Sequence, residues 1–303
     1  MGLHSDTLRD TWPRDAPDEH PAPAPPDLSH ATPWTVLRSI RDTGVAIVQA
    51  RHALIIATTM VLLMLWGFHG GVDLLGAVFK GWTGPGSTGN PQRARLIPGV
   101  PWDQEWISFA IGAALLLGVP AALIKFVFKE RLSDYGLGLP KKGRGRYTLW
   151  STVLLAAIGF PAMCVASHDP GMRATYPFFR NFASLGAFLT YELGYAVFFL
   201  VIEFVFRGYL LFGLYGAHHP GGVQGVRASQ DPPVLSHYAI LLSMLSYTAW
   251  HLGKPLQELW GTLLWGVVTG TMVLTSGTLW HVFLVHWLMN VFLDYRIWTT
   301  GGM

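Results

Sequence analysis

The residues best suited to chemistry stand inside apolar stretches in the carboxyl-terminal half of the chain. Glu203 and Arg207 lie in one stretch, His251 ends another, and His286 and Asn290 lie in a third. A charge at the middle of a bilayer costs about 2.5–3.5 kcal/mol, so such residues usually face one another or a wet cavity and mark function. Their positions therefore predict a polar site inside a helical membrane protein.

The spacing of these residues favours a shared site. Glu203 and Arg207 are four residues apart with the acid first, the favoured orientation for an ion pair on one helix. His286 and Asn290 have the same spacing, so both should point from one helix face. A structural ion pair and helix–helix hydrogen bonds would explain each pair by itself. With His251 on a separate helix, the set supplies what peptide hydrolysis needs, a base for water and donors for the oxyanion.

These residues resemble the motifs of a known family. The CPBP or Abi family of intramembrane proteases, which includes the CAAX prenyl endopeptidases, has the pattern Glu-Glu-x-x-x-Arg, then Phe-x-x-x-His, then His-x-x-x-Asn or Asp. The matches here, in order and spacing, are Glu203…Arg207, Tyr247…His251 and His286…Asn290. The resemblance covers about residues 105–294. It implies a helical bundle whose polar residues meet in a cavity within the membrane.

The resemblance also implies a role for each matching residue. His286 would help to position or activate water, and Arg207 would pair with Glu203. His251 and Asn290 would bind the oxyanion. The implied activity is that of an endopeptidase acting on a membrane-anchored or lipidated peptide or protein.

The chain departs from the pattern at the first Glu, which the family uses to activate water and which is Ile202 here. One step along a helix turns a side chain by about 100°, so Glu203 cannot occupy the missing position. We expect Glu258 to share or take the role of base with His286. It lies seven residues after His251, beside a Gly- and Pro-containing helix break where backbone can line a wet cavity. The alternative is an acid that only stabilises the first turn of its helix.

Two mechanisms remain open for an active enzyme. In one, a Glu is the general base and there is no metal cofactor. In the other, Glu203, His251 and His286 bind zinc and leave a position open for water. The sequence has no His-Glu-x-x-His motif, and we expect the mechanism without metal.

The rival function is a non-catalytic relative that binds a peptide or protein in an immunity or chaperone role. Ile202 in place of the first Glu favours this alternative. Three further polar residues, Glu192, His281 and Asp294, lie near the ends of the apolar stretches, and we expect them to reach water at the membrane surface.

Composition places the chain in a bilayer. Only 13% of the 303 residues are charged and 51% are hydrophobic, whereas a soluble domain has about 25% charged residues. Several apolar runs approach or exceed the ~18 residues that cross a bilayer, which predicts an all-α polytopic bundle of about seven spans. The net charge of +3, without a tract of basic and aromatic residues, argues against a nucleic-acid partner.

The chain divides into a tail and a membrane domain. Residues 1–35 are rich in Pro and Asp and predict a disordered tail, and residues 36–303 form the transmembrane domain. We expect an integral protein of the bacterial cytoplasmic membrane with its amino terminus in the cytoplasm, two crossings from the densest basic loop. That loop contains Lys129, Arg131, Lys141, Lys142, Arg144 and Arg146.

Overall fold

The computed structural model describes residues 32–49, 51–78, 103–215 and 234–300. Every regular element in these ranges is helical, which confirms the predicted all-α class. The predicted disordered tail lies outside the described residues except for residues 32–35, and helix α1 (Pro33–Gln49) begins within these. Residues 1–46 form a unit of their own, and the chain from Ile47 onward forms the second unit, which contains all the candidate residues.

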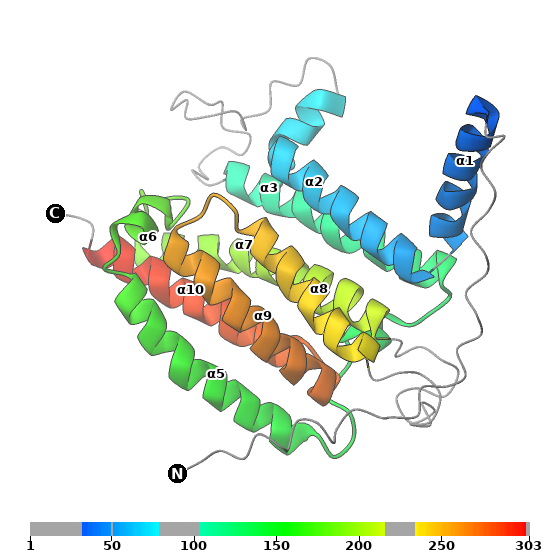
Figure 1. Ribbon diagram of the computed structural model, residues 1–303. Helices are drawn as coiled ribbons and strands as arrows, with labels where there is room; N and C mark the ends of the chain where they lie inside the picture. The colour runs from blue at the N-terminus through cyan, green and yellow to red at the C-terminus, as the bar shows by residue number, and fades with distance from the viewer. Residues whose placement is uncertain (1–31, 50, 79–102, 216–233, 301–303) are drawn as a thin grey trace, which may run out of the picture. The chain divides into compact units, whose positions relative to one another are not determined.

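The second unit is a succession of helices (Figure 1). In chain order these are α2 (Arg51–Val78), α3 (Asp103–Gly112), the π-helical η1 (Ala113–Gly118), α4 (Val119–Ala122), the π-helical η2 (Leu123–Val127), the 3-10 helix η3 (Leu132–Tyr135), α5 (Gly145–Ala166), α6 (Pro170–Thr175), α7 (Leu185–Glu203), the π-helical η4 (Phe204–Phe212), α8 (Val234–Trp250), α9 (Leu256–Ser276) and α10 (Trp280–Thr300).

Four helical segments of the described chain are long and apolar enough to cross a membrane: Trp106–Val127, Gly145–Ala166, Leu185–Phe212 and Leu256–Ser276. Two shorter apolar helices, Arg51–Trp66 and Tyr238–Trp250, accompany them. Helix α10 has 21 residues but is not one of the four. The chain is therefore an integral membrane protein, and the seven predicted spans correspond to four full-length candidates, two short helices and α10.

Local capping fixes where several helices begin and end. The Ser184 hydroxyl accepts a hydrogen bond from the Ala187 amide at 3.1 Å and starts α7. The Asp169 carboxylate does the same for the Met172 amide at 2.9 Å and starts α6. Gly277, at φ +78°, ends α9 in the left-handed conformation that glycine adopts without strain.

The turn between α8 and α9 brings the second motif to the site. These two helices pack side by side, and the turn between them lies beside α6 (Figure 1). Gly253 adopts φ +89° in this turn, which lets the chain reverse immediately after His251. Pro255 then leads into the first turn of α9, which contains Glu258. The residues on either side of the helix break thus return to the same end of the hairpin.

Gly266 sets the distance between α8 and α9. A Cβ atom added there would lie 3.0 Å from the backbone Cα of Met244 and 2.7 Å from its Cγ. Helices in membranes pack closely through small residues of this kind. At Gly261, one and a half turns earlier on α9, an added Cβ would meet nothing within 4 Å.

We predict that Gly266→Ala destabilises the protein by about 1–3 kcal/mol, because the extra methyl group forces α8 and α9 apart. Gly261→Ala is the matched control, and we expect it to be neutral or stabilising by up to about 1 kcal/mol. Thermal unfolding of the purified chain in detergent measures both. Equal behaviour of the two variants would contradict the close approach at Gly266.

Candidate active site

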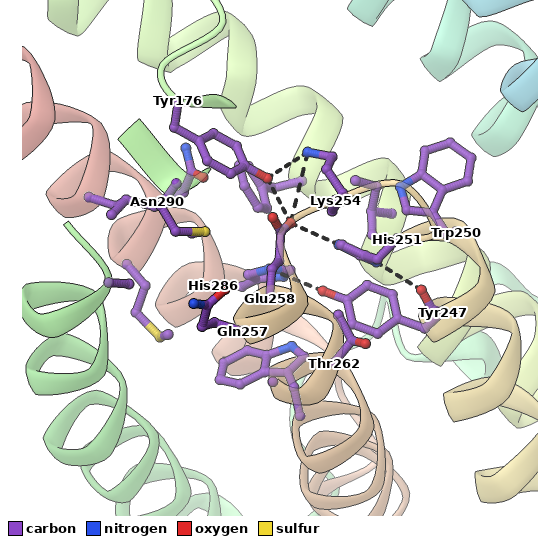
Figure 2. A pocket seen from close by; sticks show the side chains of 18 of the residues that line it. Tyr176, Tyr247, Trp250, His251, Lys254, Gln257, Glu258, Thr262, His286 and Asn290 are labelled. Carbon is purple, nitrogen blue, oxygen red and sulfur yellow. Dashed lines mark hydrogen bonds and ion pairs between the residues drawn. The ribbon is translucent and has the colours of Figure 1, made fainter. Parts of the chain in front are cut away.

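A large cavity lies within the described part of the second unit, with a volume of about 1870 Å³. Most of its wall is apolar and comes from α2, α3, α5 and α7 to α10. Ligand pockets for small molecules usually measure about 300–1,000 Å³, so this one has room for a long apolar chain. Part of its wall is a cluster of polar side chains, the polar group, which consists of Tyr176, Tyr247, His251, Lys254, Gln257, Glu258, Thr262, His286 and Asn290 (Figure 2).

The cavity separates the six candidate residues into two groups. His251, Glu258, His286 and Asn290 line it, although they come from two helices, α9 and α10, and from the turn between α8 and α9. Glu203 and Arg207 do not line it, and both are completely buried behind the wall. The first group can touch a substrate, whereas the second can act only through its neighbours.

The Glu203 carboxylate lies between two partners. Its Oε1 is 2.6 Å from Nδ1 of His286, and its Oε2 is 3.5 Å from Nε of Arg207. A carboxylate accepts hydrogen bonds, so Nδ1 of His286 carries the proton of this contact. Glu203 therefore fixes both the orientation of the His286 ring and the nitrogen, Nε2, that is left for the cavity.

Tyr247 joins the two sides of the site. The Arg207 guanidinium lies over its ring at 4.0 Å from the centroid, and its hydroxyl is 3.4 Å from Nε2 of His286. The Tyr247 backbone carbonyl accepts a hydrogen bond from Nδ1 of His251 at 2.8 Å. Where the family pattern has Phe, Tyr247 thus contacts both histidines and covers the buried cation.

The remaining nitrogen of His251 faces a carboxylate. Because the Tyr247 carbonyl can only accept, Nδ1 of His251 is the protonated nitrogen, and Nε2 is a bare acceptor in the neutral ring. Oε1 of Glu258 lies 3.5 Å from this Nε2 (Figure 2). Both atoms are acceptors, so their contact needs a hydrogen. Either one of the two atoms carries a proton, or a water molecule donates a hydrogen to each of them.

Two residues that the motifs do not include hold Glu258. The Tyr176 hydroxyl donates to Oε1 of Glu258 at 2.7 Å, and Nζ of Lys254 donates to the Tyr176 hydroxyl at 2.7 Å. Lys254 is also 3.8 Å from Oε1 of Glu258. Burial raises the pKa of Tyr176 well above its usual range, with the nearby Glu258 charge adding to this, so its hydroxyl keeps the proton that it donates.

The sequence analysis did not identify Tyr176 as a site residue. It lies 82 residues before Glu258 in a segment between helices, where no helical spacing relates the two. The sequence contains only a weak signal for Lys254, its position four residues before Glu258.

Three expectations about polar residues near helix ends are wrong. Glu192, His281 and Asp294 were expected to reach water, but they are only 1%, 5% and 0% exposed. Each is covered inside the bundle, where α7 and α10 pack together and α10 also packs on α5. Glu192 and Asp294 come together there, and Asn290 donates to Oδ2 of Asp294 at 3.0 Å.

The described residues contain no group of three His, Cys, Asp or Glu side chains arranged to hold a metal ion. The zinc alternative needs Glu203, His251 and His286 around one point. Instead, Oε1 of Glu203 is bound to Nδ1 of His286, and Nδ1 of His251 is bound to the Tyr247 backbone carbonyl.

Residues 185–292 match the family model of the type II CAAX prenyl endopeptidase Rce1-like proteins. The matched segment runs from the start of α7 into α10 and contains all three motifs. Searches of the curated proteins and of the solved structures find no match. The family match confirms the resemblance that the motifs indicate.

We predict that Arg207→Met lowers the amount of folded protein sharply, because it leaves the Glu203 charge buried without its cation, a loss of about 3–5 kcal/mol. The double variant Glu203→Gln/Arg207→Met removes both charges and should regain most of that stability. Detergent-resistant folded protein, measured by size exclusion after heating, compares the two. A double variant as unstable as the single one would show that the ion pair does not act as a unit.

Proposed function

We propose that this chain, whose residues 185–292 match the CAAX prenyl endopeptidases, is an intramembrane endopeptidase. It would hydrolyse a peptide bond of a membrane-associated or lipidated protein. The observation that supports this most directly is the contact between Glu258 and His251 on the wall of the cavity that His286 and Asn290 also line.

Glu258 and His251 are placed to activate water. A water molecule between Oε1 of Glu258 and Nε2 of His251 would donate one hydrogen to each, which raises the electron density on its oxygen. Attack on a carbonyl then transfers one proton to this pair, and general base catalysis of this kind contributes about 10²–10⁴-fold. Tyr176 and Lys254 keep the Glu258 oxygen in place during the step.

His286 and Asn290 are placed to stabilise the oxyanion. They lie one helical turn apart on α10 and both line the cavity. The Asn290 amide supplies N–H groups, and the His286 ring supplies a second donor at Nε2 when it is protonated beside the Glu203 carboxylate. This assignment differs from the roles implied by the resemblance alone. Here His251 helps to activate the water, and His286 helps to stabilise the oxyanion.

The shape of the cavity supports a lipid-anchored substrate. Its wall extends from the polar group along Leu63, Met64, Leu155 and Ile158, which offer no hydrogen bonds. An apolar chain attached to the substrate would fill this part and place the peptide next to the polar group. The substrate class is therefore a membrane-anchored peptide or protein.

The alternative is a binder that does not cut. Ile202, which stands where the family motif has its first Glu, lines the cavity and is only 7% exposed, so it makes that part of the wall apolar. A bound peptide would then meet no base at this position. Glu258 supplies a carboxylate elsewhere on the wall of the same cavity, which favours the enzyme.

We predict that Glu258→Gln lowers kcat by about 10²–10⁴-fold, because it keeps the shape of the side chain and removes the base. The assay uses internally quenched peptides ending in Cys-aliphatic-aliphatic-X, with and without a farnesyl thioether, and the full chain in detergent or vesicles. Glu130→Gln is the matched control, since Glu130 is a half-buried acid that does not line the cavity. Wild-type rates for Glu258→Gln would exclude it as the base, and binding without cleavage by the wild type would favour the binder.

Returning the carboxylate to the motif position gives a second test. Ile202→Glu places an acid on the cavity wall where the family pattern has one. We expect Ile202→Glu/Glu258→Gln to recover at least about tenfold of the rate lost in Glu258→Gln. Recovery would show that the two positions serve the same water.

We propose that the segment between Lys129 and Tyr147, which includes η3, faces the cytoplasm, on the density of Lys and Arg there, and that the amino terminus is on the same side. Ser133→Cys in a Cys164→Ala chain introduces one exposed thiol in η3, within this segment. It should react with an impermeant maleimide only after the cells are opened. Ala174→Cys in α6, beyond the carboxyl-terminal end of α5, is the control and should react in intact cells. The reverse pattern would invert the topology.

A further inference from the structure

A pair of buried carboxyl groups lies next to the site without lining the cavity. Glu192 of α7 is 1% exposed and Asp294 of α10 is completely buried. Their carboxyl groups are within hydrogen-bonding range of each other. The Trp287 indole donates to the Glu192 backbone carbonyl at 3.0 Å and holds the two helices together at this level.

The described residues provide no other hydrogen-bond donor for three of the four carboxyl oxygens. Both Glu192 oxygens and Oδ1 of Asp294 are buried, and no side chain or backbone group of the described chain donates to them. The fourth, Oδ2 of Asp294, accepts from Nδ2 of Asn290 at 3.0 Å. Two ionised carboxylates this close and out of water would repel strongly, so one proton between them is the arrangement that satisfies both.

The shared proton determines how Asn290 is held. An oxygen of ionised Asp294 can only accept, so the amide nitrogen of Asn290, and not its oxygen, must face it. One N–H of the amide is then bound to Asp294, and the second remains to donate to another acceptor. Lys254, Tyr176 and Tyr195 are also close enough to act electrostatically on Asp294.

We propose that Glu192 and Asp294 are positioning residues, which share one proton and hold the Asn290 amide with a free N–H for the oxyanion. Glu192 donates to Asp294, Asp294 accepts from Asn290, and Asn290 donates to the developing charge. No atom of the pair touches the substrate. The inference rests on the proposed peptidase function, because it assigns Asn290 its role there.

A double-mutant cycle tests the role in catalysis with the quenched peptides as substrates. Asp294→Leu should lower kcat by about 10²-fold or more, as removal of an oxyanion donor does, with KM changed by less than about threefold. In an Asn290→Ala chain the same substitution should cost less than about threefold, since the donor it positions is already absent. An equal loss in both backgrounds would show a merely structural role and overturn the proposal.

Conservative variants keep the test valid if Asp294→Leu does not fold. Glu192→Leu removes the donor to Asp294, whereas Glu192→Gln replaces it with an amide N–H. We therefore expect Glu192→Gln to recover at least about tenfold of the kcat lost in Glu192→Leu. No difference between the two variants would overturn the relay. Glu130→Gln again controls for the loss of a half-buried acid elsewhere.

Infrared spectroscopy tests the shared proton without any substrate. The wild type at neutral pH should show the carbonyl band of a protonated carboxyl group, and Glu192→Gln should lose it, whereas Glu130→Gln should keep it. Absence of the band in the wild type would overturn the shared proton, even if the peptides are cleaved. If Glu192→Gln loses the band but the wild type cleaves no peptide, the shared proton is supported and the peptidase function is refuted instead.

Discussion

The site depends on one buried carboxylate, that of Glu203. Removing a charge from water costs several kcal/mol, and only close partners offset this cost. Glu203 has two, the Arg207 guanidinium at 3.5 Å and the His286 ring at 2.6 Å. Arg207 in turn is covered by Tyr247, whose backbone carbonyl orients His251. The orientation of both histidines therefore follows from the way this one charge is satisfied.

The π-helical stretch η4 accommodates this arrangement. It starts immediately after Glu203 and includes Arg207. π-helical turns are uncommon and often occur at functional sites, because they alter the direction in which successive side chains point. Gly208 lies within the same stretch, and an added Cβ would meet the Tyr135 backbone oxygen at 2.9 Å. The close packing around η4 leaves little freedom for the ion pair to move.

Helical spacing predicts the parts of the site that lie on one helix. The pairs Glu203–Arg207 and His286–Asn290 follow from their separation of four residues, and the helical class follows from the apolar runs. Contacts between segments distant in sequence could not be predicted in this way. The bond from Tyr176 to Glu258 depends on how the segment after α6 packs against α9. The burial of Glu192 and Asp294 depends on how α7 and α10 overlap, which a single helix pattern does not contain.

The turn between α8 and α9 separates two distances that are coupled in many hydrolytic sites. One lies within the pair that activates water, and the other runs from this pair to the residues that stabilise the oxyanion. His251 and Glu258 flank this short turn, so their mutual distance is a local property of the backbone around Gly253 and Pro255. Their distance from His286 and Asn290 is instead set by the packing of the whole hairpin on the bundle. A shift of the hairpin would thus change where the attacking oxygen meets the carbonyl while leaving the distance between His251 and Glu258 as it was. The position of the attacking water relative to the substrate carbonyl and the geometry of the pair that activates it can therefore vary independently in this molecule.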